Sequence, residues 1–138
     1  MQQQYIASFL REHGIRPSLS RIKVYEYLRE YENHPTADQL YQDLLISMPG
    51  LSKTTIYNTL KLFLERGIVS SLIIDENEKR FDAETDFHAH FRCISCGMIQ
   101  DVHLLAKDLA WVGLDNYDIS EQQLYLKGYC PRCKKPSQ

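Results

Sequence analysis

The chain has 138 residues, of which 43% are hydrophobic and 25% are charged, and its formal net charge is −2. This is the composition of a globular protein, and it excludes a largely disordered chain. No apolar run approaches the ~18 residues of a membrane span, and the first residues lack the basic and apolar regions of a signal peptide, so we expect a soluble cytoplasmic protein. The near-neutral charge also argues against strong non-specific binding to nucleic acid, because such domains are usually clearly basic.

Four helices are predicted in the first part of the chain. Apolar residues recur at helical spacing between Tyr5 and Glu12, and Gly14 is placed to end this first helix. Each of the next three helices follows a side chain that can accept a hydrogen bond from a helix N-terminus: Ser18, Thr36 and Ser52. The proline-containing segments 33–35 and 48–50 separate these helices.

The fourth predicted helix runs to about Arg66, with Gly67 in the position that follows a helix, and it has two different faces. One face is apolar, and the other carries side chains suited to reading the major groove of DNA. The residues expected to contact DNA are Lys53, Thr54, Thr55, Tyr57, Asn58 and Lys61 of this helix, together with Arg21 of the second. Considered alone, the same pattern also fits an ordinary solvated amphipathic helix.

A β-hairpin is predicted directly after the fourth helix. Residues 68–74 are rich in β-formers, 75–78 form a polar turn, and 79–81 return. A helix-turn-helix followed by a hairpin is the winged-helix layout, so residues 1–82 are expected to form a DNA-binding domain. The acidic hairpin tip is unsuited to phosphate, which makes Lys79 and Arg80 at its base the expected contacts of the wing.

The second part of the chain is predicted to form a small α/β domain over residues 88–138, joined to the first by a hinge at 83–87. The complete chain is therefore expected to be α+β. The expected elements of the second domain are an antiparallel hairpin of His88–Cys93 and Met98–His103, a helix at Leu104–Val112 and a strand at Glu121–Tyr129.

Four cysteines form two C-x-x-C pairs with the overall spacing C-x2-C-x33-C-x2-C: Cys93, Cys96, Cys130 and Cys133. In a reducing cytoplasm such pairs are more typical of metal ligands than of disulfides. A set of four thiolates leaves no open coordination position, so the expected site is a structural zinc held by all four cysteines. Redox-active C-x-x-C pairs and disulfides are the alternatives.

A second set of candidate metal ligands, with nitrogen and oxygen donors instead of sulfur, lies before and after the first cysteine pair in the sequence. His88 and His90 alternate on a strand and therefore share one face, and Asp101 joins that face if it pairs with His90. Asp82 precedes the hinge, and His34 lies in the turn between the second and third helices. Imidazole and carboxylate together suit a first-row divalent ion such as iron, manganese or zinc. No role is assigned to His103, although it is placed near His88.

Five motifs resemble the Fur (ferric uptake regulator) family of bacterial metalloregulators over about residues 5–135. They are H-P-T-A-D-x-L-Y, T-T-I-Y-N-T-L, R-F-D, H-x-H-F-x-C-x-x-C-G and C-P-x-C. The resemblance implies a homodimer that binds double-stranded DNA at an AT-rich palindromic operator, with Tyr57 against thymine. It implies a C-terminal dimerisation domain with structural zinc, and a regulatory iron(II) or manganese(II) ion at the hinge. The implied regulatory ligands are His34, Asp82, His88, His90 and Asp101.

Within the family, two aspartates with three histidines most resemble the peroxide-sensing branch, in which iron catalyses oxidation of its own histidine ligands. Iron-uptake regulators tend to carry glutamate where Asp82 and Asp101 stand, and an iron-responsive repressor of iron-uptake genes is the alternative. Two other classes are a metal-dependent hydrolase and a zinc-ribbon interaction module. No general base or substrate pocket is identifiable, so the protein is not expected to be an enzyme or to bind an organic small molecule.

Overall fold

The computed structural model describes residues 2–31, 33–75, 78–85, 88–103, 112–119 and 122–135. The chain divides into two compact units, Met1–Thr85 and Asp86–Gln138. Residues 86–87 of the predicted hinge lie outside the described residues. Within the described ranges, no helix is both long enough and apolar enough to cross a membrane.

The first unit begins with four helices, as predicted: α1 (Gln2–Glu12), α2 (Leu19–Glu30), α3 (Ala37–Leu45) and α4 (Lys53–Glu65). The three predicted N-caps are confirmed, because each side-chain oxygen accepts a hydrogen bond from the backbone N–H three residues later. The capping oxygens belong to Ser18, Thr36 and Ser52. At the other end of α4, Gly67 has φ +72°, and the Ile68 N–H donates to the Phe63 carbonyl. That bond closes the helix in the way a C-terminal glycine allows.

The four helices enclose one apolar core. Leu10, Val24, Leu40, Ile56 and Phe63, drawn from all four helices, are each fully buried. The core therefore fixes which side of α4 faces inward. Its opposite face remains accessible, with Tyr57 51% exposed.

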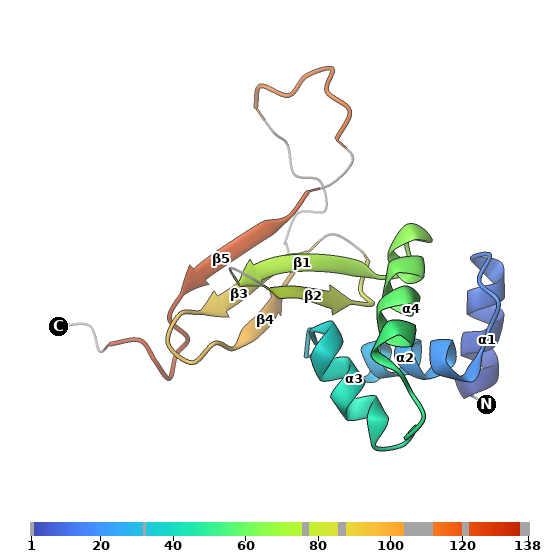
Figure 1. Cartoon of the computed structure of the whole chain (residues 1–138). Helices are drawn as coiled ribbons and strands as arrows, with labels where there is room; N and C mark the ends of the chain where they lie inside the picture. The colour runs from blue at the N-terminus through green and yellow to red at the C-terminus, as the bar shows by residue number, and fades with distance from the viewer. Residues whose placement is uncertain are drawn as a thin grey trace. The chain divides into compact units, whose positions relative to one another are not determined.

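The predicted wing is present as an antiparallel hairpin of β1 (Ser70–Asp75) and β2 (Glu78–Asp82), which follows α4 in Figure 1. β2 also pairs on its other side with the turn before α3. The Phe81 N–H donates to the Pro35 carbonyl at 3.0 Å, and Thr36 forms an isolated antiparallel bridge with Arg80. The helices and hairpin together make a winged helix, in which β2 lies beside the turn that contains His34.

The second unit is built on a three-stranded sheet of β3 (Ala89–Cys93), β4 (Ile99–Val102) and β5 (Leu124–Gly128), in the order β4-β3-β5. β3 is antiparallel to β4, as predicted, and parallel to β5, a direction that the sequence did not indicate. Figure 1 shows β3 in the middle of this sheet. Residues 104–111 of the predicted helix 104–112 lie outside the described residues.

Candidate metal centres and nucleic-acid interface

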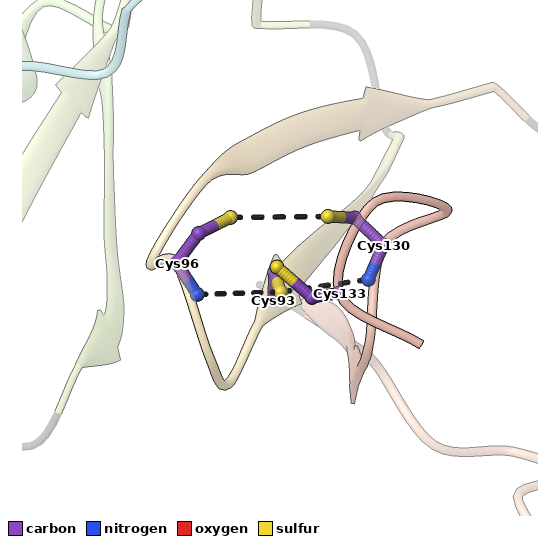
Figure 2. A group of neighbouring side chains, drawn as sticks. All are labelled: Cys93, Cys96, Cys130 and Cys133. Carbon is purple, nitrogen blue, oxygen red and sulfur yellow. Dashed lines mark hydrogen bonds between the residues drawn. The ribbon is translucent and has the colours of Figure 1, made fainter. Parts of the chain in front are cut away.

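The four cysteines form one cluster in the second unit, and Figure 2 shows their side chains gathered around a common centre. Their Sγ atoms all lie within 4.8 Å of one another. Cys96 Sγ and Cys130 Sγ are 3.8 Å apart, far beyond the ~2.05 Å of a disulfide bond. All four are free thiols, so the disulfide alternative does not describe this arrangement.

Parallel pairing of β3 with β5 brings the two C-x-x-C segments together. Cys93 ends β3 opposite Gly128 of β5, and Cys130 follows two residues later. Each segment then makes a tight turn, with the Gly97 N–H bonded to the Cys93 carbonyl and the Cys133 N–H to the Cys130 carbonyl, both at 2.9 Å. Gly97 has a φ of +77°, a left-handed conformation that glycine adopts readily in such a turn.

The cluster stabilises negative charge on the Cys93 sulfur and opposes it on the Cys133 sulfur. The backbone N–H groups of Cys96 and Cys130 donate to Cys93 Sγ at 3.5 and 3.4 Å, and these bonds lower the pKa of the Cys93 thiol to about 6. At Cys133, a hydrogen bond from Ser95 lowers the thiol pKa, but the neighbouring cysteines and burial together raise it to about 12. The thiols therefore oppose one another's ionisation, and a shared divalent cation removes that conflict. This donor set fits a closed tetrahedral zinc site.

The first unit contains two of the five predicted regulatory ligands, His34 and Asp82. His34 Nε2 lies 3.5 Å from Asp82 Oδ2, and the two side chains are only 3% and 11% exposed. The other carboxylate oxygen, Asp82 Oδ1, accepts a hydrogen bond from the Glu84 N–H at 2.8 Å. Because that bond fixes the orientation of the carboxylate, Oδ2 is directed toward the imidazole.

The second unit contains the other three, His88, His90 and Asp101. His90 is paired with Asp101 across the β3–β4 hairpin, which confirms the predicted register. Asp101 Oδ1 lies 3.4 Å from both His88 Nε2 and His90 Nε2, and both imidazoles are buried. His103 is exposed, and its ring centroid lies 5.9 Å from that of His88. Each of these two groups, called a half-site below, offers imidazole and carboxylate donors of the kind that suits a first-row divalent ion.

Five of the seven predicted DNA-contacting residues line two hollows of the winged helix. One, of about 450 Å³, places Arg21 beside Thr55 and Asn58, together with Arg16, Ser18 and Ser20, none of which was predicted to contact DNA. The other, of about 760 Å³, is lined by Tyr57, Asn58 and Lys61 of α4 and by Lys79 of β2. Thr54 is exposed on the same helix.

Asp38 of α3 is an acidic neighbour of this surface that the sequence reasoning missed. Its Oδ1 accepts a hydrogen bond from the Tyr57 hydroxyl at 3.3 Å and lies 3.6 Å from Lys53 Nζ. The Lys53 and Asp38 side chains are 57% and 63% exposed, so their ion pair contributes little to stability. Asp38 therefore contacts two of the side chains predicted to bind DNA, Lys53 and Tyr57.

Comparison with known proteins identifies the family. The sequence pattern of the ferric uptake regulator family matches residues 12–126. The chain belongs to this family. Its relatives include the peroxide-responsive repressor PerR of Staphylococcus epidermidis, which is 37% identical over 96% of this chain and 90% of the relative. The peroxide operon regulator of Bacillus subtilis is 36% identical over 91% of this chain and 89% of its own.

Solved structures of Fur-family proteins share the fold. PerR from Streptococcus pyogenes matches with a TM-score of 0.54 and 29% identity, covering 96% of this chain and 93% of that one. The ferric uptake regulator of Helicobacter pylori matches with a TM-score of 0.69 over 99% of this chain and 94% of that one. At 15% identity, the second match supports the fold alone. As a member of this family, the chain is a transcription regulator and not an enzyme.

Proposed function

We propose that this protein is a metal-dependent DNA-binding repressor that responds to peroxide, as the PerR relatives do by name. The observation that carries the proposal is a set of three buried imidazoles beside two partly exposed aspartates, on a chain 37% identical to a peroxide-responsive repressor. The protein would act in the cytoplasm as a homodimer. An iron-responsive repressor of iron-uptake genes is the alternative.

The four-cysteine cluster would hold zinc permanently and serve only the fold. Its four thiolates would fill a tetrahedral coordination shell, which leaves no position for a substrate or an oxidant. The zinc would join the β3–β4 turn to the end of β5, the two segments that carry Cys93 and Cys130. The dimerisation domain, residues 88–138, would depend on this link.

The regulatory iron(II) or manganese(II) would be held by both half-sites, His34 and Asp82 from the first unit and His88, His90 and Asp101 from the second. An ion that binds only when all five side chains converge favours one arrangement of the two units, because a ligand shifts a protein toward the state that binds it better. That arrangement would place the α4 helices of a dimer at successive major grooves of an AT-rich palindrome.

Bound iron(II) would supply the reduction of peroxide that generates an oxidant beside its ligands. Of the five ligand side chains, the imidazoles can be oxidised, whereas the carboxylates resist oxidation. The cysteines are committed to zinc. Insertion of oxygen at a carbon of the His34 or His88 ring would weaken its nitrogen as a ligand. The two half-sites would then separate and the repressor would leave DNA.

Peptide mass spectrometry tests this proposal directly. After brief exposure of the iron-loaded protein to peroxide, peptides containing His34 and His88 are expected to gain the mass of one oxygen. Peptides containing His13, which lies outside both half-sites, provide the internal control and should remain unmodified. Manganese-loaded protein should show no such gain. Intact His34 and His88 together with retained DNA binding would favour the iron-responsive alternative.

Replacing Tyr57 tests the DNA-contacting face of α4. Tyr57→Ala is expected to cost ~1–3 kcal/mol of operator affinity, through lost contact with a thymine methyl group. Tyr57→Phe is the matched control, because it keeps the ring and removes only the hydroxyl that bonds Asp38. Fluorescence anisotropy with labelled operator measures both variants. Equal affinities of the alanine variant and the unmodified protein would remove Tyr57 from the interface.

A further inference from the structure

Arg80 was expected to contact DNA as part of the wing, but the structure directs its side chain to a regulatory ligand. Arg80 Nη1 donates a hydrogen bond to the His34 carbonyl oxygen at 3.1 Å. The backbone on either side of this contact is also bonded, by the Thr36–Arg80 bridge and by the Phe81 N–H on the Pro35 carbonyl. The strand β2 is thus bonded to three consecutive residues before α3: His34, Pro35 and Thr36.

His34 has a backbone conformation that needs such support. Its φ is +49°, in the left-handed region that costs a residue with a side chain ~1–2 kcal/mol. The following residue is Pro35, and a residue before proline ordinarily adopts an extended conformation. A residue held in a disfavoured conformation persists only where its surroundings determine it. The guanidinium bond to the His34 carbonyl is one of the contacts that do so.

This conformation sets the direction of the His34 ring. With the His34 carbonyl held by Arg80, His34 Nε2 lies 3.5 Å from Asp82 Oδ2. Arg80 and Asp82 are two residues apart on β2, so they lie on the same face of the strand. One strand therefore supplies both a carboxylate and the group that aims its imidazole partner.

We propose that Arg80 is a positioning residue for the regulatory metal, acting through His34 rather than through DNA. The inference rests on the proposed function, because it takes His34 and Asp82 as ligands of that ion. Without the guanidinium, the His34 backbone relaxes toward an ordinary conformation and its imidazole moves away from the carboxylate. The wing strand is in this way part of the metal-binding machinery.

Because Arg80 is positively charged, the direction in which the metal affinity changes when Arg80 is replaced distinguishes two possible roles. A guanidinium near a divalent cation repels it, so a purely electrostatic role predicts tighter metal binding when Arg80 is removed. A positioning role predicts weaker binding. Groups that orient metal ligands typically contribute ~10–100-fold to metal affinity, and we expect a loss of about 10-fold here.

The experiment is a manganese(II) titration of the zinc-loaded full-length protein, with the free ion followed by its electron paramagnetic resonance signal. Arg80→Met keeps the apolar stem and removes the donor, and it is expected to weaken manganese binding about 10-fold. Lys79→Met removes a positive charge from the adjacent residue of β2, which lies on the opposite face. This control variant should bind manganese as the unmodified protein does. Unchanged or tighter binding by Arg80→Met would overturn the inference.

A second pair of variants tests whether the effect passes through His34. In a His34→Ala background, Arg80→Met is expected to cause no further loss, since the ligand it positions is gone; an additional loss would overturn the inference. If Arg80→Met loses its zinc or its fold, Arg80→Lys is used in its place. Arg80→Lys is expected to weaken manganese binding a few-fold, and an unchanged manganese affinity would contradict the inference. Normal manganese binding by His34→Ala would defeat the proposed function and this inference together. Weakened manganese binding by His34→Ala, together with normal manganese binding by Arg80→Met, would defeat this inference but not the proposed function.

Discussion

Replacement of Cys96 by serine is expected to release the zinc and to unfold or monomerise the C-terminal unit. The unit Asp86–Gln138 is small, and a domain of this size rarely has a core large enough to be stable without a metal or a similar link. Zinc held by four thiolates contributes on the order of 10 kcal/mol to such a domain. Serine cannot replace the thiolate, because its hydroxyl stays protonated and binds zinc poorly.

Zinc content per chain and the oligomeric state by light scattering measure this outcome. Ser95→Ala is the matched control, since it changes the neighbouring residue of the same turn and removes no ligand. The control variant should keep its zinc and its dimer. A stable dimer of Cys96→Ser without zinc would show that the cluster is dispensable for the fold.

Replacement of Asp101 by asparagine is expected to abolish regulatory metal binding while the zinc remains. One oxygen of Asp101 lies 3.4 Å from both His88 Nε2 and His90 Nε2, so this carboxylate is the centre of its half-site. Asparagine keeps the shape and removes the negative charge that compensates a divalent ion. Even groups that only orient a ligand contribute ~10–100-fold, so we expect at least about 100-fold weaker manganese binding.

Operator affinity should fall in parallel, because the two half-sites are no longer joined. His103→Ala is the matched control, as it removes an imidazole near His88 that lies outside the Asp101 trio. This variant should bind manganese and operator normally. Full operator affinity of Asp101→Asn, with its regulatory metal lost, would rule out metal-driven closure.

Local features of the fold were predictable from the sequence because they depend on near neighbours in the chain. The side chains of Ser18, Thr36 and Ser52 each cap a helix by accepting a hydrogen bond from the backbone N–H three residues later. The β3–β4 hairpin was predicted around the C-x-x-C turn, and its pairing of His90 with Asp101 is the register on which the placement of Asp101 depended. The five regulatory ligands were proposed from the family motifs, and the structure brings His34 close to Asp82 and both His88 and His90 close to Asp101.

Features that depend on distant parts of the chain were not predictable. The parallel direction of β5 arises from pairing between segments more than thirty residues apart, which no local pattern encodes. Arg80 was assigned to DNA from its charge alone, whereas its contact with His34 spans 46 residues. The left-handed φ of His34 was also unexpected, because a residue before proline ordinarily avoids it.

Operator binding by iron-loaded and manganese-loaded protein, with and without peroxide, tests the central claim most directly. The operator is a duplex selected from a random library by the manganese-loaded protein, and binding is followed by fluorescence anisotropy. Both metal forms should bind it tightly before treatment. Brief peroxide exposure should release only the iron-loaded protein, because manganese fills the same ligands without the oxidising chemistry. Retention of the iron-loaded protein on the operator after peroxide, or equal release of both forms, would contradict peroxide sensing through iron at His34, Asp82, His88, His90 and Asp101.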